Sequence, residues 1–283
     1  MSRREWKRRP AAARAQARPP GFKAPRAADA PVILYGWHPV SAALENPTRR
    51  IRKLFATENA VRRLAKDGVR LPIEPEIVRP ETIARRLTPE AVHQGLLAEA
   101  DPLPALELAE IPDGIVLVLD QITDPHNVGA IARSAAAFSA SAIVTTARHS
   151  PEATGVLAKA ASGALEYVPL VAVQNLARAL AALKERGFLV VGLDSAGTSD
   201  LAETPIRSPL ALVLGAEGKG LRQLTLATCD LVARLRVPGK IKSLNVSNAA
   251  ALALYLASKR LALNLPEGRI AEGDPGGGNT NKS

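Results

Sequence analysis

The sequence contains a single cysteine, Cys229, and only four histidines among its 283 residues. One cysteine cannot form an internal disulfide, and it rules out zinc and iron–sulfur sites that are built from cysteines. The histidines, His38, His93, His126 and His149, show none of the short-spaced pairs that metal ligands usually form. We therefore expect a protein that binds no metal and works in a reducing compartment.

Aromatic residues are scarce at 3%, and long apolar runs are absent although 47% of the residues are hydrophobic. No run approaches the ~20 residues that span a bilayer, so we expect a soluble protein with no membrane partner. The sequence also lacks the G-x-x-x-x-G-K-[ST] signature and any G-x-G-x-x-G after a strand. These absences disfavour a nucleoside triphosphatase and a conventional dinucleotide dehydrogenase.

The net charge of +10 is concentrated at the N-terminus. Residues 1–30 hold nine Lys and Arg against Glu5 and Asp29, whereas the remaining chain is close to neutral. The isoelectric point therefore does not predict nucleic-acid binding by the folded body. We expect this arm to be disordered and to tether RNA in the cytoplasm. Its composition also suits a mitochondrial transit peptide, which would place the protein in the matrix.

Composition and hydrophobic periodicity divide the remaining chain into two α/β domains. The expected segments are the basic arm 1–30, a small α/β front domain 31–100, a proline-containing linker 101–112, a C-terminal domain 113–265 and a disordered tail 266–283. In the C-terminal domain, apolar strands alternate with helices, which predicts a mostly parallel sheet covered on both faces. The front domain carries clustered basic side chains that form either a solvated surface or an RNA-contacting face.

The expected elements follow from the same patterns. Predicted strands are 51–56, 95–100, 115–119, 142–145, 167–171, 188–193, 210–214 and 231–237. Predicted helices are 41–45, 60–66, 80–87, 128–138, 152–161, 176–186, 221–228 and a final helix from residue 248.

Three strand-to-helix junctions of the C-terminal domain, 120–133, 214–220 and 237–247, are dense in Asn, Gly, Glu and Ser. Each follows a strongly apolar strand. Because the carboxyl ends of parallel strands meet at one edge of a sheet, we expect the three loops to converge there.

The first loop places Asn127 just ahead of a helix and Gly129 where the backbone permits a close approach. Arg133 lies on the same helix face as Gly129, where it binds a phosphate or ribose or else faces solvent. In the second loop, Glu217 stands between Gly215 and Gly218. It either binds a ribose hydroxyl, orients another loop or is a solvated turn residue.

In the third loop the chain turns at Pro238 and Gly239, and Asn245, Ser247 or Asn248 can cap the following helix. That helix has no polar face before Ser258, so we expect it to be buried with only its N-terminus accessible.

The three loops resemble the ordered motifs of the SpoU class of SPOUT RNA ribose 2′-O-methyltransferases. The residues that carry this resemblance are Asn127 to Arg133, Leu214-Gly-Ala-Glu-Gly218 and Ser243-Leu-Asn-Val-Ser247. Tyr35-Gly-Trp-His38 and His93-Gln-Gly95 are similar to the substrate-binding domain of 23S rRNA guanosine-2′-O-methyltransferases. The resemblance covers about residues 32–265.

This resemblance implies a C-terminal trefoil knot, S-adenosyl-L-methionine as cofactor, a homodimer, and RNA as substrate. The expected substrate is the ribose of a guanosine in 23S rRNA; a tRNA enzyme and a non-catalytic RNA-binding or ribosome-assembly protein are the alternatives. The implied catalytic residues are Asn127, Arg133, Glu217, Ser243 and Asn245. The implied cofactor-binding residues are Leu193, Leu214, Gly215, Glu217, Gly218, Leu235, Val237, Pro238, Ser243, Leu244 and Val246.

Within this set, the resemblance assigns activation of the 2′-hydroxyl to Arg133. An arginine side chain is a poor base at neutral pH, because its pKa lies far above that range. Our hypothesis is therefore that Arg133 anchors the target phosphate and stabilises the developing alkoxide. Near the third loop, Arg234, Arg236, Lys240 and Lys242 either hold RNA phosphates or form a solvated edge.

Overall fold

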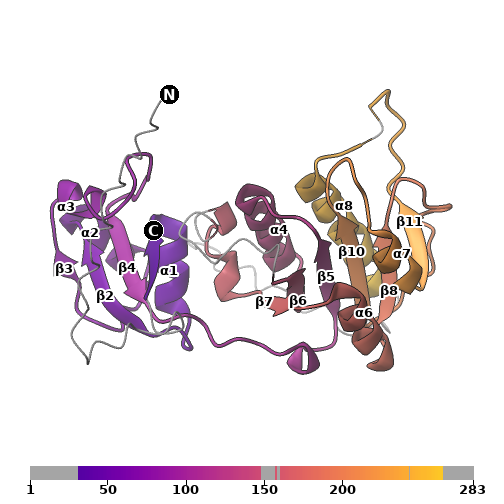
Figure 1. Cartoon of the computed structure of the whole chain (residues 1–283). Coiled ribbons are helices and arrows are strands. Elements are labelled where there is room, and N and C mark those ends of the chain that lie inside the picture. Colours follow the sequence, from indigo (N-terminus) through magenta and orange to yellow (C-terminus); the bar gives the residue numbers. More distant parts are fainter. Residues whose placement is uncertain (1–30, 148–156, 158–159, 242, 264–283) are drawn as a thin grey trace, which may run out of the picture.

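The computed structural model describes residues 31–147, 157, 160–241 and 243–263 and places them in two α/β units joined by an extended segment (Figure 1). The basic arm, the C-terminal tail, Lys242 and most of the helix expected at 152–161 lie outside the described residues. Among the residues it describes, no helix has the length and apolarity to cross a membrane.

The front domain is built on a four-stranded sheet in the order β1-β4-β2-β3. Its elements are β1 (Val32–Tyr35), α1 (Trp37–Glu45), β2 (Ile51–Ala56), α2 (Glu58–Lys66), β3 (Glu76–Ile77), α3 (Pro80–Ala84) and β4 (Leu96–Ala100). Helix α2 starts two residues before the predicted 60–66 because Thr57 caps it, accepting a hydrogen bond from the amide of Ala60. Ala60 and Leu64 form the buried face of this helix.

The C-terminal domain contains a seven-stranded sheet in the order β7-β6-β5-β10-β8-β11-β9. Its strands are β5 (Ile115–Asp120), β6 (Ala142–Thr146), β7 (Leu170–Val173), β8 (Leu189–Leu193), β9 (Ser199–Asp200), β10 (Leu210–Gly215) and β11 (Leu231–Arg234). Every neighbouring pair in this sheet is parallel, which confirms the predicted architecture.

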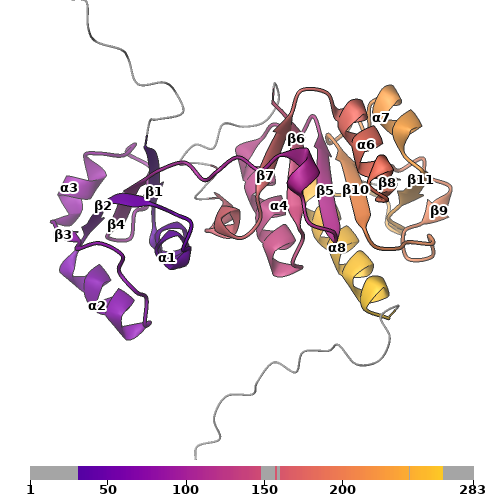
Figure 2. The ribbon, with the colours of Figure 1, turned by 90° about the horizontal axis from the view of Figure 1, so that it is seen from below.

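Helices cover both faces of this sheet (Figure 2). They are α4 (Pro125–Ala137), α6 (Leu176–Glu185), α7 (Gln223–Thr228) and α8 (Val246–Leu263). Leu117 and Leu119 of β5 pack in a core cluster with residues of α4 and α8, whereas Val116 and Val118 share a cluster with α6. Because both faces are covered, the central strands are continuous apolar runs without alternation.

Two predicted strands of the C-terminal domain differ from the structure. The strand expected at 167–171 begins only at Leu170, since the chain first forms a 3₁₀-helix, η3 (Ala164–Glu166), that leaves Tyr167 exposed. The strand expected at 231–237 pairs only to Arg234, because its neighbour β9 ends at Asp200. The two-residue strands β3 and β9 are too short to produce a recognisable sequence pattern.

The final helix, α8, differs from the buried helix that we expected. It starts at Val246, and Asn245 caps it by accepting hydrogen bonds from the amide and hydroxyl of Ser247. One face packs on α4 and β10, but Leu252 and Tyr255 on the other face are exposed. The sequence of α8 has no polar stripe along one side. In the single chain, however, only one face of the helix packs against the core.

The one cysteine gives a test of this packing. Burial, together with the nearby Asp230 carboxylate, raises the pKa of the Cys229 thiol to about 11, and Sγ donates to the carbonyl of Thr225. At pH 8 we expect alkylation by iodoacetamide to be about 100-fold slower than for an ordinary thiol, because little thiolate is present. Comparable alkylation rates for the native protein and for the protein unfolded in guanidinium would contradict this packing.

Candidate functional site

The loops that follow β5, β8, β10 and β11 meet at the carboxyl edge of the seven-stranded sheet. This confirms the predicted convergence, because all four strands run parallel and are neighbours in the sheet. The loops after β8, β10 and β11 surround a cavity of about 490 Å³. Its lining consists of Leu193, Asp194, Ser195, Leu214, Gly215, Ala216, Glu217, Gly218, Lys219, Gly220, Leu235, Val237, Ser243, Leu244, Val246 and Ala249.

This lining contains every residue that we predicted to bind a cofactor except Pro238. Leucine and valine side chains from β8, β10 and the segment after β11 form its apolar part. Asp194, Glu217, Lys219 and Ser243 contribute charged and polar groups. Such a concave site, mainly apolar with a few polar groups, is typical of small-molecule binding.

The glycine-rich loop after β10 depends on the absence of side chains. A Cβ atom at Gly215 would lie 2.2 Å from the carbonyl carbon of Gly220, so the two ends of this loop touch backbone to backbone. Gly218 and Gly220 have positive φ angles of 75° and 65°, which L side chains rarely adopt. The loop therefore offers its backbone to the cavity, leaving Glu217 exposed at its tip.

A hydrogen bond of 3.1 Å joins the first and third loops, from Asn245 Nδ2 to Asn127 Oδ1. Asn127 does not precede the helix as we predicted but lies in the first turn of α4, which begins at Pro125. Asp124 is the cap, since its carboxylate accepts from the amide of His126 at 3.1 Å. An Asp-Pro pair suits this role, because proline at the first helical position has no amide that needs a partner.

Arg133 is exposed on α4, and its side chain has no hydrogen-bonding or ionic partner in the part of the chain that the structure describes. It does not line the cavity. Gly129, one helical turn earlier, is buried, and a Cβ atom at this position would lie only 2.4 Å from the Cβ of Ala160. Their spacing of four residues thus does not give the two residues the same environment.

Sequence reasoning missed two acidic residues that organise the loops. The buried Asp120 side chain at the end of β5 accepts from Arg222 Nε at 2.6 Å and from the Arg222 amide at 3.1 Å, which ties the first loop to the end of the second. Asp194, at the end of β8, accepts from the amides of Ala196 at 2.9 Å and Leu221 at 3.5 Å. Each follows directly on an apolar strand, and this position was the available signal.

The basic side chains of the front domain and those near the third loop lie in different environments. Arg49 is buried in an ion pair with Glu166, so it does not belong to an RNA-contacting surface. Arg63 lies 3.8 Å above the centre of the Trp37 ring, and Arg52 pairs with Asp101. Near the third loop, Arg234 Nη1 donates to the carbonyl of Gly197 at 3.0 Å.

No group of three or more His, Cys, Asp or Glu side chains that could hold a metal ion occurs within the described residues. The site consists of an apolar cavity, a glycine-rich backbone loop and polar groups at the rim of the cavity. Together with the parallel sheet, these features define an α/β protein that binds a small molecule where its loops converge.

Comparison with known proteins identifies the family. Residues 114–255 match the model of the SpoU rRNA Methylase family, and residues 33–106 match the RNA 2′-O ribose methyltransferase substrate binding model. The chain belongs to the SpoU rRNA methylase family.

Two similar relatives carry the name 23S rRNA (guanosine-2′-O-)-methyltransferase RlmB. The protein from Ralstonia nicotianae is 39% identical over 243 residues, covering 81% of this chain and 95% of the relative. The protein from Pseudomonas putida is 36% identical over 238 residues, covering 80% of this chain and 96% of the relative.

Among solved structures, the fold is similar to that of the SpoU methyltransferase AviRb from Streptomyces viridochromogenes, crystallised with AdoMet. The TM-score is 0.69, with 24% identity, and the match covers 82% of this chain and 90% of that chain. This likeness supports the fold assignment across both domains.

The link between Asp120 and Arg222 gives a test of the loop arrangement. We expect Asp120→Asn to lower the free energy of unfolding by about 2–3 kcal/mol, less than for a fully buried pair, because Arg222 is 42% exposed. Urea unfolding measures this change. The control Asp113→Asn alters an exposed carboxylate and should change stability by less than about 0.5 kcal/mol. Equal effects of the two substitutions would contradict the structural role of Asp120.

Proposed function

We propose that this protein transfers a methyl group from S-adenosyl-L-methionine to the 2′-hydroxyl of a guanosine ribose in 23S rRNA. The observation that carries the proposal is the convergence of the three family motifs at one sheet edge, two of them lining the cavity and the first joined to the third through Asn127 and Asn245. The names of relatives that are 36% and 39% identical support the choice of 23S rRNA guanosine.

The residues of the cavity fit this cofactor. Leu193, Leu235 and Leu244 supply apolar walls suited to an adenine ring, and the backbone from Gly215 to Gly220 can approach a ligand closely. Asp194 offers a carboxylate suited to ribose hydroxyls or an ammonium group. When bound, the cofactor supplies an electrophilic methyl group for in-line displacement.

The polar residues of the motifs act around that cavity. Ser243 stands on its rim, and the Asn127–Asn245 hydrogen bond holds the start of α4 against the start of α8. In this proposal Ser243 and Asn245 face the target ribose, and Leu244 and Val246 contact the cofactor. Glu217, at the exposed tip of its loop, orients the ribose or a neighbouring loop.

Arg133 serves the reaction as a cation. In this role the positively charged guanidinium binds the target phosphate and stabilises negative charge developing on the ribose oxygen. Its exposed position outside the cavity, without a partner among the described residues, leaves the side chain available to an incoming RNA.

The proposal includes a homodimer and a knotted chain. The exposed face of α8, with Leu252 and Tyr255, is an apolar surface that a second copy can cover. Strand β11 pairs between β8 and β9, although β9 follows β8 in sequence, and Gly197 of their connection lies against the backbone of Ala233 in β11. This order of strands supports the threading of the chain through a loop, which few folds contain.

The proposal assigns rRNA and not tRNA as the substrate. The names of the relatives favour rRNA over tRNA. The relatives named above are bacterial proteins, and the proposal accordingly places the activity in the cytoplasm. A non-catalytic RNA-binding protein would not need the cavity, whose apolar walls and glycine-rich loop are both present.

The activity test compares 2′-O-methyl positions in total RNA from cells with and without this protein. We expect one guanosine of 23S rRNA to lose its methyl group, and replacement of that ribose by 2′-deoxyribose should abolish transfer in vitro. Loss of a methyl group from tRNA alone would overturn the assignment of the substrate. No change in any RNA, and no transfer of radiolabel to unmodified rRNA, would overturn the proposed activity.

The role of Arg133 is tested by two substitutions in the same assay. Removing a charged group that stabilises the transition state costs about 100-fold or more, so Arg133→Ala should lower kcat/KM by that factor. Arg133→Lys should retain more activity, since it keeps the charge. The control Arg178→Ala removes an exposed arginine on α6 and should leave kcat/KM unchanged. Full activity of Arg133→Ala would refute both roles given to this residue.

The cofactor wall is tested by Leu244→Asp. A carboxylate placed in the apolar part of the cavity should weaken S-adenosyl-L-methionine binding at least about tenfold, because burying the charge is unfavourable. Isothermal titration calorimetry measures the affinity. Leu224→Asp, on the exposed surface of α7, is the matched control. If both variants bound the cofactor as tightly as the wild type, Leu244 would not line its site.

A further inference from the structure

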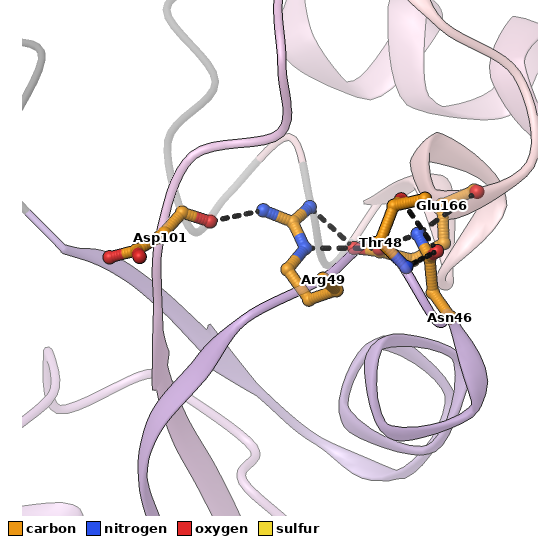
Figure 3. Close-up of polar contacts among 5 residues, drawn as sticks. All are labelled: Asn46, Thr48, Arg49, Asp101 and Glu166. Atoms are coloured by element: carbon orange, nitrogen blue, oxygen red, sulfur yellow. Dashed lines mark hydrogen bonds and ion pairs between the residues drawn. The ribbon is translucent and has the colours of Figure 1, made fainter. Parts of the chain in front are cut away.

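A buried ion pair joins the two domains (Figure 3). Arg49, in the turn between α1 and β2, donates to Glu166 at the end of η3, with Nη2 at 2.6 Å from Oε1 and Nε at 3.0 Å from Oε2. The Arg49 and Glu166 side chains are only 6% and 3% exposed. Two parallel hydrogen bonds between a guanidinium and a carboxylate are strongly directional, so they define an orientation as well as a contact.

Further polar groups surround the same pair. Asn46 Nδ2 donates to Glu166 Oε2 at 2.8 Å, and Asn46 Oδ1 accepts hydrogen bonds from the amide and hydroxyl of Thr48 at 3.0 and 2.8 Å. Arg49 Nη1 donates to the carbonyl of Asp101 at 2.7 Å. One guanidinium therefore links the front domain, the first linker residue and the C-terminal domain.

The backbone contact beside the ion pair has no spare room. A Cβ at Gly163 would lie 2.7 Å from Ala42 Cβ and 2.8 Å from the carbonyl oxygen of His38, and Gly163 has a φ of 85°. Helix α1 thus packs directly on the backbone that leads into η3, on the side of the front domain that faces the C-terminal domain (Figures 1 and 2).

The far end of the linker is fixed as well. Arg186, at the end of α6, donates through Nη1 to the carbonyl of Leu108 at 2.6 Å and through Nη2 to the carbonyl of Ile111 at 2.5 Å. The Ile111 side chain is buried in the core of the C-terminal domain. The segment from Asp101 to Ile111 is therefore held at both ends.

We propose that Glu166 is a positioning residue: through Arg49 and Asn46 it locks the front domain in one orientation, so that RNA bound there presents its target ribose to the cavity. This rests on the proposed function. Domains joined by a linker move relative to one another unless their interface prevents it. Locking them raises the effective concentration of the target ribose at the cavity for an RNA that contacts both domains.

The physical character of the pair favours orientation over stability. Removing two charges from water is costly, and an apolar pair of similar size often stabilises a protein equally well. Replacement by apolar side chains therefore separates the two roles: the contact is kept while its directional hydrogen bonds are lost.

The experiment uses the full chain and the double variant Arg49→Met/Glu166→Leu. We expect its thermal stability to stay near that of the wild type and kcat/KM on a large rRNA fragment to fall at least about tenfold. With a short oligonucleotide that contains only the target loop and reaches only the C-terminal domain, kcat/KM should stay within twofold. Cofactor affinity by calorimetry should also be unchanged.

Two further variants complete the test. Glu166→Gln breaks the ion pair while preserving the side-chain volume, and it should show the same selective loss on the large RNA. The control Glu185→Gln changes an exposed carboxylate on α6 and should have no effect. An equal loss on both RNAs, or a weaker cofactor affinity, would mean damage to the C-terminal domain and would overturn the positioning role. Unchanged activity of the double variant on the large RNA would overturn it too.

Small-angle X-ray scattering tests the locked orientation of the front domain without an activity measurement. The double variant should show a broader distribution of interatomic distances and a larger maximum dimension than the wild type, because its front domain is released. Identical scattering curves would refute the locked orientation. If the wild type methylated neither RNA, the proposed function would fail, yet the scattering comparison would still test the lock.

Discussion

The site depends on one constraint, the parallel pairing of β10 between β5 and β8. Each of these strands is an apolar run buried on both faces, so the polar residues that follow them have only the carboxyl edge of the sheet to occupy. The cavity forms there because β5, β8 and β10, which come from separate parts of the sequence, all end at this edge of the sheet. A shift in the register of β10 would move its glycine-rich loop away from the loops of β5 and β8.

Short polar links then fix the loops against one another. Asp120 holds Arg222, Asp194 accepts from the amide of Leu221, and Asn127 bonds to Asn245. None of these links contributes a large apolar area; each satisfies backbone or side-chain groups where the regular hydrogen bonding of the sheet ends. A site that binds a cofactor and positions a ribose benefits from such order, since little rearrangement then accompanies binding.

A buried ion pair connects the two domains. Arg49 and Glu166 lie well away from one another in sequence and are both nearly inaccessible, which is unusual for charged residues. Arg49 is one of the clustered basic residues of the front domain, for which the sequence alone leaves RNA contact open. Its burial removes it from that surface and makes it part of the junction, while Arg50 and Arg52 remain at the surface beside Asp101.

Strand runs and loop composition are local properties, and they are enough to predict the parallel α/β class and the three loops. Most of the cavity lining was anticipated only through the resemblance of the loop motifs to the SpoU class. Asp120 and Asp194, at the ends of β5 and β8, were missed, because their position after an apolar strand does not reveal the groups that they bind. Three outcomes could be seen only in the folded chain: Arg133 lies outside the cavity, α8 keeps an exposed face, and Glu166 contacts Arg49. These outcomes depend on contacts between residues distant in the chain, for which local periodicity carries no signal.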